Sequence, residues 1–163
     1  MLGELYFVDK EHPRFIHVHT YVSEEQKFTP GQTISTTVCN RSERVLSITK
    51  KWREDDFEKV RASHFKDFPS RYTCLFLSVN LGNAQFWADK IRSRTGNIQC
   101  VEVELLSGKY VYVDEQYYNI ENFRREDIID EAQCYWSGDE VIENPIIVIL
   151  FEGVFRVCRE INL

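Results

Sequence analysis

Ser70, Arg71 and Tyr72 place a hydroxyl, a planar cation and an aromatic ring side by side, just before an apolar stretch that runs to Phe76. An arginine forms bidentate hydrogen bonds with phosphate, and a tyrosine ring stacks on planar groups. The three side chains could therefore hold a phosphate together with a base or a nicotinamide ring. In the structural alternative, Arg71 at the start of a strand forms an ion pair with a neighbouring carboxylate, and Tyr72 packs in the core. The sequence leaves both open.

Two histidines form the second candidate group. His17 and His19 lie two residues apart in a predicted strand, Arg14–Val22, so strand alternation places them on one face together with Tyr21. They could donate hydrogen bonds to a ligand hydroxyl, or they could be a satisfied pair on a strand face. A shared metal ion would need a third, distant ligand. Because the chain lacks clustered thiolates and histidines, we predict no metal site.

Two glutamates bracket the last apolar run, Ile146–Phe151. Glu143 precedes it, and Glu152 follows it directly. A carboxylate beside a hydrophobic strand can act as a general base or stabilise positive charge on a sugar ring. The structural alternatives are a loop carboxylate before Pro145 and half of a Glu-Gly turn. Neither Gly-x-x-x-x-Gly-Lys-Ser/Thr nor Gly-x-Gly-x-x-Gly occurs, so any nucleotide would be held without these phosphate-binding loops.

The composition predicts one globular domain over residues 1–163, with 43% hydrophobic residues and a net charge of −6. The negative charge disfavours nonspecific binding to nucleic acid. No apolar run is long enough to cross a membrane, and the N-terminus lacks a secretory signal. The cysteines are odd in number and far apart, which favours thiols in a reducing cytoplasm. They are Cys39, Cys74, Cys100, Cys134 and Cys158.

Alternating apolar residues and turn-forming dipeptides predict several strands and a turn at Thr29–Gln32. The predicted strands are Arg14–Val22, Thr33–Cys39, Tyr72–Val79, Ile98–Leu105, Lys109–Val113 and Pro145–Cys158. Ser107-Gly108 suggests a two-residue hairpin turn between the fourth and fifth of these. We expect the last strand to bend at Gly153 or to divide there.

Three segments have helical periodicity. They are Trp52–Phe65, a segment from an N-cap at Asn83 to Gly96, and Arg125–Trp136, with Ile128, Ile129, Ala132 and Trp136 facing inward. Strands and helices do not alternate strictly. The order therefore favours an α+β domain with a largely antiparallel sheet over a doubly wound parallel one.

Four segments together give a resemblance that spans most of the chain. They are Phe15–Val18, Pro30–Gln32, Pro69–Phe76, and Ala132-x-x-Tyr135-Trp136-x-Gly138 before a strand with Glu152-Gly153. In combination they resemble a family of bacterial and phage proteins of undefined function that is grouped with the ADP-ribosyltransferase-like fold. The resemblance implies two small, mostly antiparallel sheets with three helices around a central cleft.

The same resemblance implies roles for the candidate residues. NAD would lie between the two sheets, with His17 or His19 holding a ribose. Ser70, Arg71 and Tyr72 would support the nicotinamide. Glu143 or Glu152 would steady the positively charged ribose as nicotinamide leaves. The superfamily often begins its late strand with glutamate, whereas this chain has isoleucine at position 146.

Two functions of different classes follow from the resemblance. The first is an NAD-dependent ADP-ribosyltransferase that modifies a protein or nucleic-acid acceptor, as a toxin or a phage or defence factor. The second is a non-catalytic nucleotide-binding or protein-interaction module on the same scaffold, with a protein partner. An RNA-processing enzyme of the superfamily is a third option, which the acidic charge balance disfavours.

Overall fold

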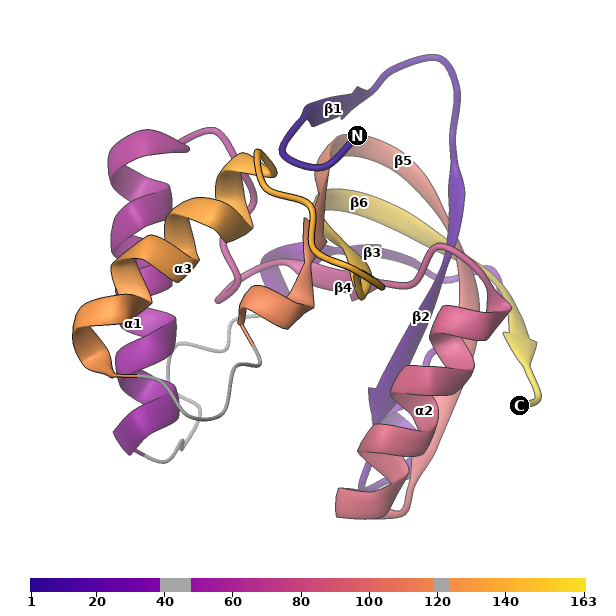
Figure 1. Cartoon of the computed structure of the whole chain (residues 1–163). Helices are drawn as coiled ribbons and strands as arrows, with labels where there is room; N and C mark the ends of the chain where they lie inside the picture. The colour runs from indigo at the N-terminus through magenta and orange to yellow at the C-terminus, as the bar shows by residue number, and fades with distance from the viewer. Residues whose placement is uncertain (39–47, 119–123) are drawn as a thin grey trace.

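The structure is a computed structural model that describes residues 1–38, 48–118 and 124–163. In these ranges the chain forms an α+β fold (Figure 1). The strands are β1 (Leu5–Val8), β2 (Arg14–Thr20), β3 (Thr33–Ser35), β4 (Leu75–Leu77), β5 (Ile98–Asp114) and β6 (Ile147–Ile161). The helices are α1 (Ile48–His64), α2 (Leu81–Thr95) and α3 (Arg125–Ser137), with short 3-10 turns at Glu24–Gln26, Thr36–Val38 and Glu115–Tyr117.

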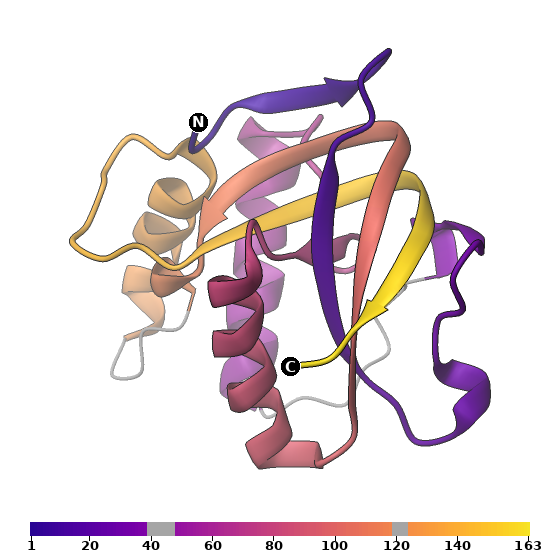
Figure 2. The same cartoon turned by 90° about the vertical axis from the view of Figure 1, so that its right-hand side faces the viewer.

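The strands form a single six-stranded sheet, in which every strand pair is antiparallel. The long strands β5 and β6 are its centre; β1 and β2 pair with β5, and β3 and β4 pair with β6. A bridge between Ile16 and Ser78 joins β2 to β4, which closes a circuit through β5 and β6. The expectation of two small sheets is therefore wrong for the described residues. One sheet curls strongly enough to meet itself (Figure 2).

The predicted hairpin at Ser107-Gly108 is also wrong, because β5 continues through it. Gly108 lies opposite Gly153 of β6, and the register between the strands shifts just before it, at Leu105/Ser107. A Cβ atom on Gly108 would lie 2.1 Å from the carbonyl oxygen of Glu152. The glycine is needed where two bent strands approach closely, not for a chain reversal.

The closed curl separates two cores. Inside it, alternate residues of β4, β5 and β6 form a fully buried cluster that includes Leu75, Val101, Ile149 and Phe155. On the outer face, α1 and α3 lie side by side against the other residues of β5 and β6, centred on Trp136. Helix α2 packs through Ala84 against the outer face of β2 and β5, and its Trp87 reaches the core centred on Trp136. This strand alternation decides which side chains can meet in a site.

Several element boundaries differ from the sequence expectations. Asn80 is the N-cap of α2 and accepts from the backbone N–H of Asn83, which lies inside the helix. Gly96 ends α2 as expected, but Ile129 of α3 is 42% exposed instead of inward-facing. Strands β3 and β4 are shorter than predicted, because backbone turns occupy Thr36–Val38 and Ser70–Cys74. The expected Cys39 end of β3 lies outside the described residues.

Candidate functional site

His17 lies on β2 with its side chain inside the curled sheet, opposite Val101 of β5. It is 4% exposed, and its Nδ1 atom lies 2.8 Å from the carbonyl oxygen of Phe76 on β4. Because a carbonyl oxygen only accepts, Nδ1 must carry the proton. The bond fixes both the tautomer and the orientation of the imidazole, and it links the first candidate strand to the central one.

His19 is held by a different partner, Gln99 of β5. The Gln99 side chain accepts from the backbone N–H of Phe28 at 2.8 Å and donates to its carbonyl at 2.9 Å. These two bonds fix the orientation of the amide, so Nε2–H of His19 donates to Oε1 of Gln99 at 2.7 Å. The rings of His17, His19 and Phe28 lie within 5.6 Å of one another, centroid to centroid. The expectation that both histidines share a face is confirmed.

Ser70 and Tyr72 both bind carboxylates of α1. The Ser70 hydroxyl donates to Glu58 at 2.9 Å, and the Tyr72 hydroxyl donates to Asp55 at 2.6 Å. Burial, together with the bond to Asp55, raises the pKa of Tyr72. These two side chains thus fasten the turn before β4 to the helix that packs beside it.

Arg71 is 8% exposed and makes the most contacts of the three. It donates to Glu54 at 3.1 Å, to Glu115 at 2.6 Å and to the Tyr135 hydroxyl at 2.6 Å. Its guanidinium carbon lies 3.8 Å from the centre of the Tyr118 ring. Arg71 therefore forms ion pairs with neighbouring carboxylates just before β4, as the structural alternative for this residue expected, and does not depend on a ligand for its partners.

The charges and burial around Arg71 determine the protonation states of Arg71 and Tyr135. Burial opposes the charge on Arg71, but Glu115, Tyr135 and Glu54 together hold the pKa of the guanidinium well above its ordinary value. Burial raises the pKa of Tyr135 well above its ordinary value, although Arg71 opposes that shift. Tyr135 therefore remains a neutral donor to Glu115.

Neither candidate glutamate has a described contact with the histidine pair or with Ser70, Arg71 and Tyr72. Glu143 is exposed in the loop before β6. Glu152 lies opposite Lys109 of β5 and is 4.0 Å from its ammonium nitrogen. Tyr110 and Phe151, which pair next to them, pack in the interior of the curl, so Glu152 projects to the opposite face from His17.

A protein-family model matches residues 5–163 and is described as a protein of unknown function, DUF2441. The chain belongs to the DUF2441 family. This confirms the expectation of a family of undefined function, whereas its grouping with the ADP-ribosyltransferase-like fold stays a prediction. No curated protein matches the sequence.

His17 and Arg71 both contact Phe76, but from opposite faces of the sheet. The Phe76 carbonyl accepts from His17, and its ring centre lies 5.0 Å from the guanidinium carbon of Arg71. Phe76, Trp87 and Tyr118 all pack against the same outer core. We call four side chains of the outer face the β4 aromatic cluster: Phe76 and Tyr118, whose rings both face the Arg71 guanidinium, Arg71 itself, and Trp87, which packs against the same core.

Sequence reasoning missed most partners in this region. Glu54, Glu115 and Tyr135 carry no local pattern that links them to Arg71, and Gln99 has none that links it to His19. Trp87 belongs to the apolar stripe of α2, which predicted packing only. Its Nε1 is buried and has no hydrogen-bond partner in the described part of the chain.

Two further findings bear on the class of site. Among the described residues, no group of three or more His, Cys, Asp or Glu side chains is arranged to hold a metal ion. None of the described helices has the length and apolar character required to span a membrane.

Proposed function

We propose that this domain binds NAD or a closely related nucleotide at the β4 aromatic cluster, on an ADP-ribosyltransferase-like scaffold, without transferring ADP-ribose. The observation that carries the proposal is the buried indole N–H of Trp87, which has no hydrogen-bond partner among the described residues. The resemblance implies that the central strand supports the nicotinamide, and Phe76 of that strand packs against the same core as Trp87. His17 lies inside the curl, so the ribose role that the resemblance implies for it is not part of the proposal.

Trp87 supports a planar ligand with a hydrogen-bond acceptor. Its indole N–H is buried without a partner among the described residues, which is costly unless an acceptor satisfies it. The carboxamide oxygen of nicotinamide is such an acceptor, and the aromatic rings around it favour a flat ring. We therefore propose that the nicotinamide end of the ligand lies on the outer face, beside α2.

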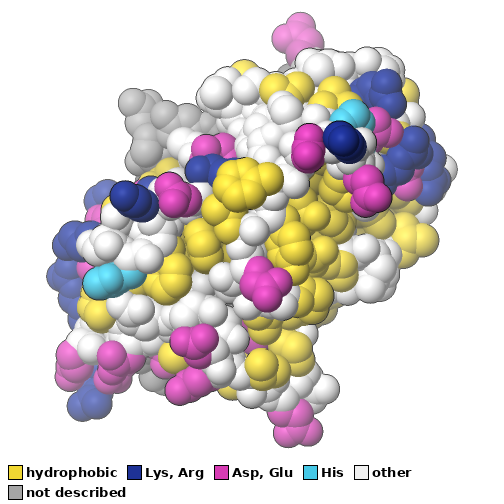
Figure 3. All heavy atoms as spheres, turned by 90° about the horizontal axis from the view of Figure 1, so that it is seen from above, with side chains coloured by type: hydrophobic (Ala, Val, Ile, Leu, Met, Phe, Trp, Pro, Cys, Tyr) yellow, Lys and Arg dark blue, Asp and Glu magenta, His cyan; other side chains and the backbone are white. Residues whose placement is uncertain are grey.

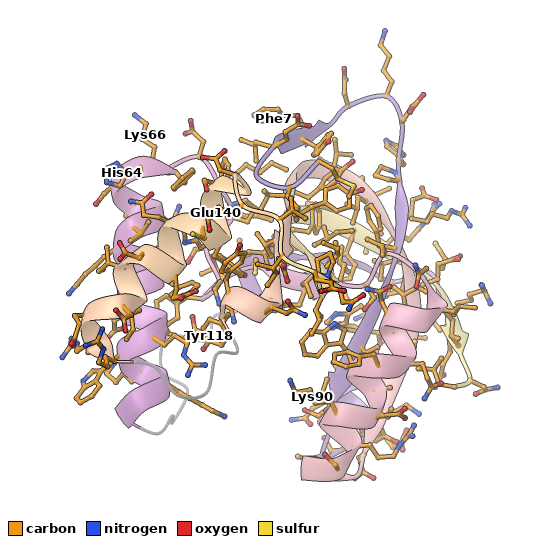
Figure 4. All side chains as sticks on the ribbon, viewed as in Figure 1. Phe7, His64, Lys66, Lys90, Tyr118 and Glu140 are labelled. Atoms are coloured by element: carbon orange, nitrogen blue, oxygen red, sulfur yellow. The ribbon has the colours of Figure 1, made fainter. Side chains whose placement is uncertain are left out.

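Lys90 supplies charge near this position. Its ammonium nitrogen lies 5.2 Å from the centre of the Trp87 ring, one helical turn along α2. Figure 4 shows Lys90 on the flank of α2 that faces Tyr118. A cation there suits the pyrophosphate of a dinucleotide, whereas Arg71 is already engaged by Glu54 and Glu115.

The carboxylates favour binding over transfer. Cleavage of the nicotinamide bond builds positive charge at the ribose, and a carboxylate about 3 Å away would stabilise it. Glu143 lies in an exposed loop. Glu152 projects to the same outer face as the proposed nicotinamide position, but it contacts Lys109 near the Gly108–Gly153 crossing and has no described contact with the β4 aromatic cluster. Of the two expected functions, these positions favour the non-catalytic nucleotide-binding module over an enzyme acting on a protein or nucleic-acid acceptor. The thiols of Cys100, Cys134 and Cys158 suit a reducing cytoplasm, which we propose as the compartment.

Binding is tested by calorimetry with NAD, ADP-ribose, AMP and nicotinamide. We expect NAD to bind, and Trp87→Phe to weaken it about five-fold, because one hydrogen bond contributes about 1 kcal/mol. The matched control is Phe86→Leu, the exposed neighbour of Trp87 on α2. Unchanged affinity in Trp87→Phe, or no heat at millimolar NAD, would show that the nucleotide does not bind there.

Transfer is tested separately by incubating the protein and cell lysate with labelled NAD. We expect no label on any macromolecule. Label transfer that disappears in Glu143→Gln or Glu152→Gln would establish the transferase and overturn the non-catalytic part of the proposal.

A further inference from the structure

We propose that β1 is a docking edge, to which a partner protein adds an extended segment with apolar residues between basic ones. Strand β1 pairs with β5 along one side only. On its other side, no strand lies among the residues that the structure describes, and both ribbon views show β1 at the margin of the fold (Figures 1 and 2). An edge strand presents unpaired backbone donors and acceptors, which an added strand can satisfy.

The side chains of β1 suit an apolar occupant. Phe7 is 71% exposed, while Tyr6 on the opposite face stacks on Tyr110 with centroids 5.3 Å apart. Figure 3, which views the molecule from the top of Figure 1, where β1 lies, shows hydrophobic side chains gathered across the middle of this face, with polar atoms and an acidic side chain among them. Edge strands in monomeric proteins commonly carry lysine or proline as protection, and Leu5–Val8 contains neither. An added strand would cover Phe7 on one face and extend the tyrosine stack on the other.

The charges at the two ends of β1 select the occupant. Glu4 precedes the strand, and Asp9 and Glu11 follow it; all three are exposed, with Lys10 the single basic residue between them. A partner strand with lysine or arginine at its ends would meet opposite charge across the pair. A second copy of this chain fits less well, because antiparallel pairing of Leu5–Val8 with itself sets Glu4 opposite Asp9.

The test uses two synthetic capped peptides, Lys-Val-Phe-Val-Lys and Glu-Val-Phe-Val-Glu, added to the protein labelled with nitrogen-15. We expect the basic peptide to bind at least ten-fold more tightly, with amide shifts centred on Leu5–Val8 and slower hydrogen exchange there. The variant Phe7→Lys should weaken binding at least ten-fold. Val22→Lys, at an 88% exposed site in the loop after β2, should leave binding of the basic peptide unchanged.

Charge reversal gives a second readout. Glu4→Lys combined with Asp9→Lys should reverse the preference toward the acidic peptide while the fold stays intact. Equal binding of both peptides, shifts away from β1, or full binding by Phe7→Lys would each overturn the proposal. Self-association of the wild type that Phe7→Lys abolishes, without binding of the basic peptide, would assign the edge to a second copy instead.

Discussion

The Arg71 guanidinium donates a 2.6 Å hydrogen bond to the hydroxyl of Tyr135, which in turn donates to Glu115 at 2.7 Å. Glu115 also accepts directly from Arg71 at 2.6 Å, so the three groups close a buried triangle. Each comes from a different part of the fold: the turn before β4, the 3-10 turn after β5 and helix α3. The triangle thus joins the helical layer to the sheet, and Arg71 connects it to the β4 aromatic cluster.

Replacement of Arg71 by methionine should destabilise the protein by about 3–5 kcal/mol, because it leaves the buried Glu115 and the partly buried Glu54 without their cation. Chemical denaturation followed by circular dichroism measures the change. Arg92→Met is the matched control, since Arg92 is exposed and pairs only with Asp89 in its described contacts. A loss below 1 kcal/mol in Arg71→Met would show that the triangle is not a structural link.

Tyr135→Phe should cost about 1–3 kcal/mol, because it removes one donor to Glu115 and one acceptor for Arg71 while the ring remains. The same denaturation experiment measures it. Tyr6→Phe serves as the control, since the Tyr6 hydroxyl bonds only to exposed Glu4 in the described structure. Equal effects of the two changes would contradict the buried network.

Gly153→Ala should destabilise the protein by about 1–3 kcal/mol or prevent folding. A Cβ atom there would lie 2.0 Å from the carbonyl oxygen of Ser107, and the backbone φ of Gly153 is +154°. Gly82→Ala in α2 is the control, because its closest contact would be 3.3 Å, to the Asn80 side chain. If both variants unfold at the same temperature, the close strand crossing is absent.

This crossing also shows where sequence reasoning reaches its limit. Ser-Gly favours a hairpin turn, but glycine is equally required where two backbones approach, and only the tertiary partner Gly153 decides between them. The helices and the shared face of His17 and His19 were predictable, because they depend on local periodicity. The contacts of Arg71 were not, since its partners Glu54, Glu115 and Tyr135 lie 17, 44 and 64 residues away.

The N-cap of α2 shows a smaller limit of the same kind. Asn80 and Asn83 are both good capping residues three positions apart. The structure uses Asn80 as the cap and turns Asn83 toward the carbonyl of Ile147 on β6. The sequence predicted a helix start with asparagine, but only packing against β6 selects which one.

The pH dependence of stability should depend on Glu104. Burial of this carboxyl opposes its charge, but Arg156 and Arg14 overcome that and lower the pKa of Glu104 below its ordinary value. A lowered folded pKa contributes stability above the ordinary carboxyl pKa, about 4.3, which is lost as pH falls through the folded pKa. As the pH falls from about 6 to about 3, the unfolding temperature of Glu104→Gln should therefore decrease less than that of the wild type. In thermal scans, the exposed control Glu25→Gln should show the same dependence of unfolding temperature on pH as the wild type. The same dependence in Glu104→Gln would contradict the prediction.

Cys100 should be almost inert to alkylation in the folded protein. Burial, opposed only by Arg159, raises the pKa of its thiol to about 11, and the thiolate is the reactive form. At pH 8 we expect alkylation of Cys100 by iodoacetamide to be about 100-fold slower than in the chain unfolded by guanidinium, and to rise about ten-fold per pH unit up to pH 10. Site-resolved mass spectrometry measures each cysteine, with the partly exposed Cys158 as the internal reference. A Cys100 rate that levels off below pH 9 would mean that Ile16 and Ala84, which pack with Cys100 of β5, do not shield its thiol.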